Sequence, residues 1–193
     1  PNVPRSSHGM LHVDGLAKGY DERTLFTDLS FRVTRGSRTA IVGPNGGGKT
    51  TLLRLILGRE QPDAGAMHVG RGVRLGYYAQ EGENMDPSLS AVEVCKAVGA
   101  EETWARTVLG CLKLRGSAPE RAVGSMSAGE RGKVALARLL LSDVNLLVLD
   151  EPTNHLDIDA QEAVEETLGQ FPGGILFVSH DRAFTDALAD EVI

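Results

Sequence analysis

The chain has 193 residues, of which 41% are hydrophobic and 24% are charged. This length suits one domain with a substantial core, and this composition argues against a disordered chain. No apolar run approaches the roughly 20 residues that cross a bilayer, and a formal charge of -6 gives the domain no general attraction for nucleic acid.

The two ends of the chain suggest a fragment. Residues 1–10 are polar, interrupted by proline and without the apolar segment of a secretory signal, so we interpret them as a linker tail or a remnant of expression. Residues 11–193 are expected to form one domain, truncated at its C-terminal end because residues 189–193 look like the start of another strand. Cys95 and Cys111 lie in no metal-binding spacing, and we expect free thiols of a reducing cytosol.

Strand and helix patterns alternate along the chain. Apolar residues that are β-branched or aromatic predict strands between turn signals, and apolar residues at helical spacing predict helices. In chain order, the expected elements are strands 11–13, 30–33 and 39–42, a helix 50–57, strands 67–69 and 73–78, helices 91–98, 102–114 and 128–141, a strand 146–149, a helix 158–168, a strand 174–178 and a helix 182–188. This order predicts an α/β fold with a mostly parallel sheet and a helical insert in the middle.

A glycine-rich loop joins the third strand to the first helix. Its residues are Gly43-Pro44-Asn45-Gly46-Gly47-Gly48-Lys49-Thr50, followed by Thr51. The order strand, loop, helix separates a phosphate loop from a chance match. Backbone N–H groups at the start of the helix would hold phosphate oxygens, Lys49 would add a positive charge, and the Thr50 hydroxyl would ligate Mg²⁺. The alternative is a glycine-rich turn that binds nothing.

Two carboxylates follow the apolar strand 146–149. In an open α/β sheet, ligands bind at the C-terminal ends of the strands, which is where Asp150 and Glu151 are placed. We expect Asp150 to hold Mg²⁺ through water, and Glu151 to orient or deprotonate an attacking water. The alternative is an acidic cap at the end of a strand.

A histidine follows the strand 174–178 at the same edge of the sheet. His180 would lie near a γ-phosphate, where it could sense the phosphate or stabilise the transition state. A lone histidine at a strand end is more often structural, so this prediction depends on the phosphate loop and the carboxylates nearby.

The segment Ser127-Ala128-Gly129-Glu130-Arg131 resembles the signature motif of ATP-binding-cassette (ABC) ATPases. With the phosphate loop and the carboxylate pair, the resemblance covers residues 11–193. It implies a phosphate-loop fold of the ABC type, with a mostly parallel core sheet, an antiparallel β subdomain at the N-terminal end and a helical subdomain at roughly residues 85–126. The implied cofactors are ATP and Mg²⁺.

The resemblance also implies roles for single residues. Tyr20 would stack on adenine, although an isolated aromatic residue is more often part of a core. Gln80 would bind Mg²⁺ and sense the attacking water, and His180 would be the switch histidine.

In this family the signature acts on a partner. Two domains face head to tail, so Ser127 to Glu130 would contact the ATP of a second ABC domain in the same polypeptide, or of the other copy in a homodimer. Ser127 would cap the helix, and the N–H groups of Gly129 and Glu130 would stay exposed for the partner's phosphate. This chain has Met126 and Ala128 where the family more often has Leu and Gly, and the Ala128 methyl bears on how tightly the domains close.

The D-loop segment Asn154-His155-Leu156-Asp157 indicates the branch of the family. Asn154-His155 resembles the F subfamily, which lacks membrane domains. Its members typically join two ABC domains by a charged helical linker, bind the ribosome and act in translation, some of them protecting the ribosome from antibiotics. The plain alternative is that this segment connects a strand to a helix, with Asp157 as the helix cap.

The leading hypothesis is therefore a cytoplasmic ATPase, slow as an isolated domain, that contacts the ribosome through a linker absent from this chain and has no membrane partner. It would be the second domain of a tandem protein. One alternative is the cytoplasmic ATPase subunit of a membrane transporter. The other is a regulatory nucleotide module that does not hydrolyse ATP.

Overall fold

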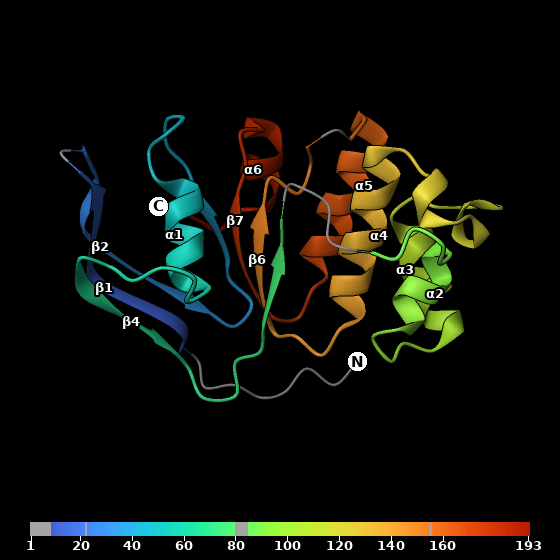
Figure 1. The fold of residues 1–193 in the computed structure, drawn as a ribbon, viewed down its shortest axis with the longest axis horizontal. Helices are drawn as coiled ribbons and strands as arrows, with labels where there is room; N and C mark the ends of the chain where they lie inside the picture. The colour runs from blue at the N-terminus through green and yellow to red at the C-terminus, as the bar shows by residue number, and fades with distance from the viewer. Residues whose placement is uncertain (1–8, 22, 80–84, 155) are drawn as a thin grey trace.

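A computed structural model describes residues 9–21, 23–79, 85–154 and 156–193. The described chain has three parts: an antiparallel sheet, a parallel sheet with helices on both faces, and a small helical subdomain at the end opposite the antiparallel sheet (Figure 1). This arrangement confirms the predicted α/β fold with an antiparallel β subdomain and a helical subdomain.

The antiparallel sheet contains β1 (Gly9–Tyr20), β2 (Arg23–Thr34) and β4 (Ala64–Val69), in the order β2-β1-β4. β1 and β2 have 12 residues each and are much longer than the strands expected at 11–13 and 30–33. Their pairing register shifts between Val13 and Leu16 and again between Leu16 and Lys18. These irregularities interrupt the two-residue alternation by which a strand is recognised, so the sequence pattern identifies only the regular ends.

The start of β1 differs from the expected domain boundary. The strand begins at Gly9, inside the segment predicted to be a tail, and Met10 is fully buried. The Met10 carbonyl also accepts a hydrogen bond from Gly70 N at 3.0 Å. Met10 is therefore part of the fold because it fills the core between the two sheets.

The parallel sheet brings the predicted site to one edge. It contains β5 (Leu75–Tyr78), β6 (Leu146–Asp150), β7 (Gly174–Val178), β3 (Arg38–Ile41) and β8 (Glu191–Val192), in that order and all parallel. Because the strands run the same way, the phosphate loop after β3, Asp150 and Glu151 at the end of β6, and His180 after β7 all meet at the C-terminal edge.

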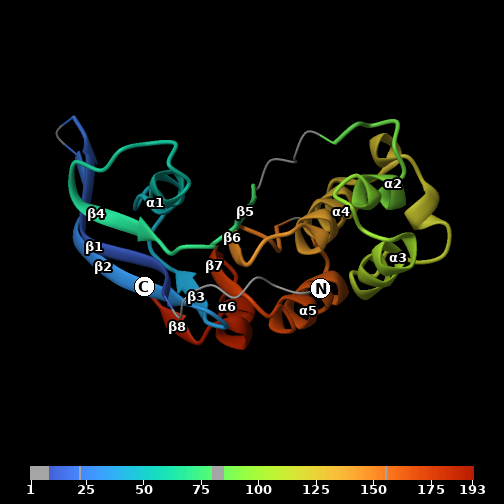
Figure 2. The same cartoon turned by 90° about the horizontal axis from the view of Figure 1, so that it is seen from below.

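Both faces of the parallel sheet are covered (Figure 2). Leu146 and Val148 of β6 face α1 (Lys49–Ile56) and the antiparallel sheet, whereas Leu147 and Leu149 face the other core, which includes the helices α4 (Ala128–Leu141), α5 (Ile158–Gly169) and α6 (Arg182–Leu188). Burial on both sides explains why β6 is one continuous apolar run instead of an alternating pattern.

The helical subdomain contains α2 (Ala91–Lys96), α3 (Glu102–Cys111) and the 3₁₀ turns Ala118–Glu120 and Val123–Ser125. α2 and α3 pack against each other and against α4, so the signature helix belongs to this packing unit. No helix in the described part of the chain is both long enough and apolar enough to cross a membrane.

Candidate active site

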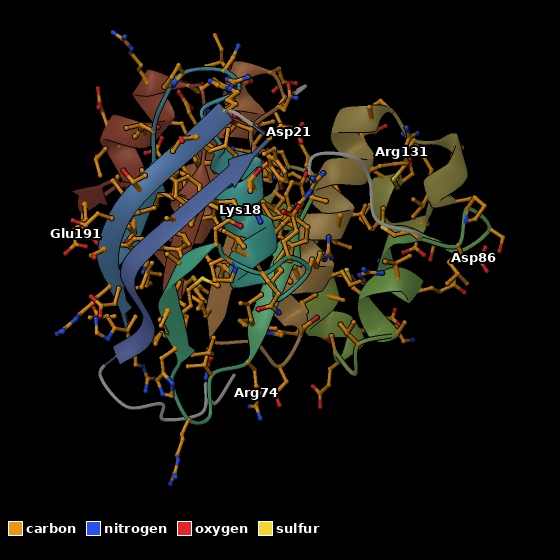
Figure 3. The ribbon with its side chains drawn as sticks, turned by 60° about the vertical axis from the view of Figure 1, so that its left-hand side comes forward. Lys18, Asp21, Arg74, Asp86, Arg131 and Glu191 are labelled. Carbon is orange, nitrogen blue, oxygen red and sulfur yellow. The ribbon has the colours of Figure 1, made fainter. Side chains whose placement is uncertain are left out.

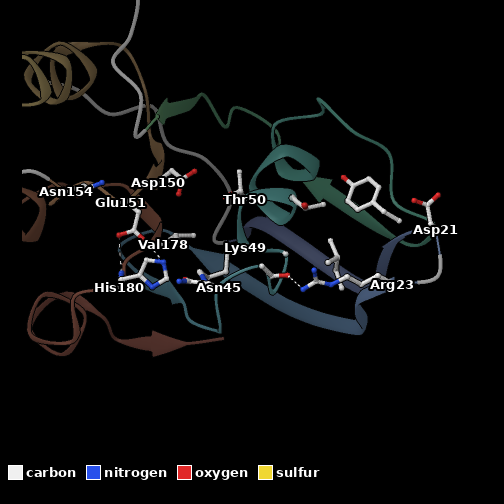
Figure 4. A pocket seen from close by; sticks show the side chains of 15 residues that line it. Asp21, Arg23, Asn45, Lys49, Thr50, Asp150, Glu151, Asn154, Val178 and His180 are labelled. Atoms are coloured by element: carbon white, nitrogen blue, oxygen red, sulfur yellow. Dashed lines mark hydrogen bonds and ion pairs between the residues drawn. The ribbon is translucent and has the colours of Figure 1, made fainter. Parts of the chain in front are cut away.

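A cavity of about 970 Å³ lies at the C-terminal edge of the parallel sheet (Figure 4). One wall is the phosphate loop, a second carries Asp150, Glu151 and His180, and a third is the tip of the β1–β2 hairpin with Tyr20. Residues predicted separately from the sequence therefore meet in one place.

The phosphate loop presents a helix N-terminus to this cavity. Gly48 is the N-cap of α1 with a φ of 91°, and no side chain caps the N–H groups of the first turn. A side chain at Gly48 would also be strained, because L residues rarely adopt this conformation. Lys49 Nζ donates to the carbonyls of Gly43 and Pro44 at 2.8 and 2.9 Å, so the cation is held against the loop. Free N–H groups and an adjacent cation form a site for an anion.

The predicted loop residues divide between two faces. Six of them line the main cavity, namely Asn45, Gly46, Gly48, Lys49, Thr50 and Thr51. Gly43 and Gly47 instead line a smaller cavity of about 160 Å³ on the other side of the loop. A Cβ atom at Gly47 would lie 2.9 Å from the Pro44 carbonyl oxygen, so this glycine permits the tight turn of the loop.

Asp150 is a buried carboxylate beside the loop. Burial raises its pKa above the ordinary value, while a hydrogen bond from Tyr77 and the positive charges of Arg54 and Lys49 oppose the shift. A buried carboxylate in the same cavity as the Thr50 hydroxyl suits Mg²⁺, which prefers oxygen ligands. The donor set therefore fits a nucleoside triphosphate with its metal. Tyr77 was not predicted from the sequence, because its partner lies on the neighbouring strand.

Glu151 has an unusual backbone conformation. Its φ of 52° lies in the left-handed region, which costs a residue other than glycine on the order of 1–3 kcal/mol. Its N–H donates to Val178 O at 3.0 Å, and its Oε2 accepts from His180 N at 3.1 Å. The β6 and β7 strand ends thus hold Glu151 and His180 together.

The other carboxylate oxygen of Glu151 remains available. Oε1 is buried and lies 3.2 Å from His180 Nε2, yet it has no hydrogen-bond partner among the described residues. This separation is short, but it lacks the geometry of a hydrogen bond. Glu151 lines the cavity, where a carboxylate can accept a proton from a bound water.

Tyr20 is not a core residue. Its side chain is 46% exposed and lines the cavity. The hydroxyl donates to the Glu60 carboxylate, and Lys18 Nζ lies 5.3 Å from the ring centroid. These contacts fix one end of the ring and leave the rest of the side chain at the cavity, as a stacking role requires.

The signature segment is organised within its own chain. Ser127 is the N-cap of α4 and forms a capping box with Glu130: Ser127 N donates to Glu130 Oε2 at 2.9 Å, and Glu130 N donates to Ser127 Oγ at 3.2 Å. Arg121 donates to both oxygens of Glu130. The hydrogen bond from Ser127 N, and to a smaller extent the hydrogen bonds from Arg121, hold the pKa of Glu130 below its usual value.

This organisation changes one sequence prediction. The N–H of Glu130, which we expected to stay exposed, is occupied by Ser127 Oγ. The N–H groups of Ala128 and Gly129 remain, because the first turn of a helix has no intrahelical acceptors for them.

The signature segment does not line the cavity of its own chain, as far as the described residues show. Figure 3 shows Asp21 at the hairpin tip of the antiparallel sheet and Arg131, just after the signature, on the helical subdomain. Any nucleotide that Ser127 to Glu130 contact must therefore come from elsewhere.

Of the D-loop residues that the structure describes, Asn154 is the one that lines the cavity, and it is exposed. Leu156 is half-buried against the core, and Asp157 caps α5 by accepting a hydrogen bond from Ala160 N at 2.8 Å, as the sequence predicted. The predicted residues Gln80 and His155 lie outside the described residues.

Sequence reasoning missed Arg23 and Asp21 of the hairpin, which line the cavity. The strands expected from the sequence, 11–13 and 30–33, end far from both residues, so the sequence pattern did not mark the turn between β1 and β2.

Comparisons with known proteins identify relatives of this chain. The family model described as ABC transporter matches residues 26–154. The whole chain is 40% identical to the energy-dependent translational throttle protein EttA of Escherichia coli strain K12 and 38% identical to that of Mycobacterium tuberculosis strain CDC 1551 / Oshkosh. It spans 36% of the length of each.

Solved structures show the same fold. An ATP-binding subunit of an ABC transporter is 25% identical, with a TM-score of 0.77 over 94% of this chain and 83% of that one. A bacterial Atm1-family ABC exporter with ATP bound has a TM-score of 0.79 over 96% of this chain and 37% of that one, at 24% identity. The translational relatives are consistent with the resemblance to the F subfamily. The phosphate loop, the carboxylate pair, the fold and the matching family model together show that the chain belongs to the ABC family of ATP-binding domains.

Proposed function

We propose that this domain binds ATP with Mg²⁺, hydrolyses it when paired head to tail with a second ABC domain, and belongs to a cytoplasmic polypeptide that acts on the ribosome. One observation carries the proposal. Lys49, Asp150, Glu151 and His180 share a single cavity, whereas the signature helix lies outside it. The domain therefore has one half of each of two composite sites.

Each wall of the cavity has a role in binding. The loop residues from Gly43 to Thr51 surround the phosphates through backbone N–H groups and the charge of Lys49. Tyr20 stacks on adenine. Thr50, Asp150 and Gln80 hold Mg²⁺, which neutralises charge on the phosphates when it is bound.

Glu151 and His180 carry the reaction. The Glu151 carboxylate orients the water and accepts its proton as the water oxygen bonds to the γ-phosphorus and the bond to the β-phosphate oxygen breaks. His180, held 3.2 Å from Oε1 of Glu151, contacts the γ-phosphate. The N–H groups of the partner's signature complete the anion site, and the D-loop residues Asn154 and His155 lie at the contact between the domains.

The ribosomal part of the proposal has separate support. The Asn154-His155 pair resembles the F subfamily, and the whole chain is similar to proteins named for control of translation. The chain spans about a third of those proteins, which leaves room in them for a second ABC domain and a linker.

The test uses the full-length polypeptide that carries this domain. Glu151→Gln should keep ATP affinity, abolish most single-turnover hydrolysis, and raise the fraction of protein that sediments with ribosomes when ATP is present. Glu162→Gln, at an exposed position of α5, is the matched control and should behave as the unaltered protein. Unchanged hydrolysis in Glu151→Gln would remove Glu151 as the catalytic carboxylate, and ribosome binding that ignores ATP would remove the proposed coupling.

A transport function has support of its own. The described fold superposes on an ATP-binding subunit of an ABC transporter. This alternative predicts that the full-length protein co-purifies with a membrane protein and does not sediment with ribosomes. The same sedimentation experiment therefore separates the two functions.

A further inference from the structure

Arg23 is a cation in the cavity that the sequence motifs do not include. It is the first residue of β2 and pairs with Tyr20 across the hairpin turn. Its Nη2 donates to the carbonyl oxygen of Gly46 at 2.8 Å, and its side chain lines the main cavity. Figure 4 shows Arg23 between Asp21 and the phosphate loop. The hairpin of one sheet thus reaches the loop that follows a strand of the other.

The contact with Gly46 uses only part of the guanidinium group. Arginine has five N–H donors in a planar fork. Within the described residues, the Arg23 guanidinium has one acceptor, the Gly46 oxygen, and forms no ion pair with a carboxylate. Arg121, by comparison, directs two nitrogens at the carboxylate of Glu130. As far as the described residues show, Arg23 therefore retains donors and a charge with no carboxylate partner at the cavity.

The guanidinium lies directly over the loop. A Cβ atom at Gly46 would be 3.1 Å from Arg23 Nη2 and 3.8 Å from Nη1. A phosphate oxygen that enters the loop beside Gly46 and Lys49 must therefore approach this group closely. The planar fork of arginine matches the geometry of phosphate oxygens, and such charged hydrogen bonds are stronger than neutral ones.

We infer that Arg23 is a second phosphate-binding cation of the site, which holds the loop through Gly46 and donates its remaining N–H groups to the phosphates of a nucleoside triphosphate. The inference rests on the proposed nucleotide binding. It divides the positive charge of the site between two elements: Lys49 at the helix start and Arg23 at the hairpin tip.

The experiment separates the charge of Arg23 from its contact with the loop. Arg23→Gln keeps an amide donor for the Gly46 carbonyl but removes the charge, and Arg23→Lys keeps the charge. The dissociation constant of ATP is measured by calorimetry at low and at high ionic strength. Loss of a charge-assisted hydrogen bond predicts about tenfold weaker binding for Arg23→Gln at low salt. Arg23→Lys should retain most of the affinity, and the difference between Arg23→Gln and the unaltered protein should shrink at high salt because exposed charges are screened.

Arg32→Gln is the matched control, since Arg32 is an exposed arginine of the same strand and should bind ATP as the unaltered protein does. Unchanged affinity in Arg23→Gln, or a loss that is the same at both salt concentrations, would overturn the inference and leave Arg23 with at most the loop contact. Failure of the unaltered protein to bind ATP would overturn the proposed function as well. Loss of binding in Lys49→Ala together with full binding in Arg23→Gln would overturn this inference alone.

Discussion

Arg38 lies outside the nucleotide cavity, and replacing it with methionine should destabilise the fold of the domain. Arg38 begins β3, the strand that leads to the phosphate loop, and only 8% of its surface is exposed. Burial lowers the pKa of Arg38, because it disfavours the charged form of the guanidinium, while the charge of Asp190 opposes this shift. In return, the guanidinium donates to five backbone carbonyls between 2.5 and 3.3 Å away, those of Gly36, Leu168, Gly169, Phe171 and Gly173. Apart from Gly36, which precedes β3, these carbonyls belong to the end of α5 and the segment before β7, so Arg38 connects the strands that lead to the phosphate loop and to His180.

The magnitude follows from the carbonyls that would lose their donor. The contacts with Leu168, Phe171 and Gly173 are buried. The Leu168 carbonyl would keep the N–H of Phe171 as a donor, so the carbonyls of Phe171 and Gly173 are the two left unsatisfied. An unsatisfied buried carbonyl costs about 1 kcal/mol or more, and relief of the buried charge offsets part of the total, so we expect a loss of about 3 kcal/mol. For a domain of this size, that corresponds to a fall in melting temperature of roughly 6–12 °C.

Thermal unfolding followed by circular dichroism measures this effect. Arg71→Met is the matched control, because Arg71 is exposed, and a surface substitution should change stability by about 0.5 kcal/mol at most. Equal melting temperatures for Arg38→Met and Arg71→Met would refute the view that the carbonyl contacts of Arg38 stabilise the fold.

Three further substitutions test the site. Tyr77→Phe removes the hydrogen bond that lowers the pKa of Asp150, so the Mg²⁺ concentration for half-maximal hydrolysis should rise, most strongly at acidic pH; a pH-independent change would contradict this reasoning. Asp150→Asn should abolish hydrolysis but raise the melting temperature at neutral pH. Because the pKa of Asp150 is raised in the folded state, Asp150 contributes to the stability of the fold below the ordinary aspartate pKa, and this contribution is lost as the pH rises through the folded-state pKa. A higher melting temperature of Asp150→Asn that persists in strong acid would argue against burial as the cause. Ser127→Ala should lower the free energy of unfolding by about 1 kcal/mol, because it removes the helix cap. Ser127→Asp should keep the cap and impair only hydrolysis by the paired domains. A Ser127→Ala variant as stable as the unaltered protein would show that the capping box adds little to stability.

The parallel core was predictable because its signals are local. The strand 174–178 and the helices 128–141 and 182–188 have the predicted boundaries, since continuous apolar runs and helical spacing do not depend on partners. The phosphate loop and the strand-end carboxylates follow from the same topology, because parallel strands bring their C-terminal ends to one edge.

The antiparallel hairpin was not predictable in the same way. Asp28 has a φ of 52° and Gly15 a φ of 58°, and such positions break the alternation of a long strand. The contacts that sequence reasoning missed also join separate elements. Arg23 reaches Gly46 across the gap between two sheets, and Tyr77 reaches Asp150 from the adjacent strand. Neither pair has a fixed spacing in the chain, so no sequence motif could reveal it.

The contrast between the signature and the catalytic residue bears on how two domains would close. Ser127, Glu130 and Arg121 form a reciprocal set of hydrogen bonds, so the segment offered to a partner is already fixed in shape. Glu151 instead has a left-handed backbone and one carboxylate oxygen that forms no hydrogen bond with any described residue. A strained backbone such as that of Glu151 changes conformation more easily than a hydrogen-bond network whose groups are all paired, such as that of Ser127, Glu130 and Arg121. On the proposed head-to-tail pairing, the signature segment should therefore keep its conformation when the domains close, whereas the contact between Glu151 and His180 should change. The residues that rearrange for hydrolysis would then lie on the domain that holds the nucleotide.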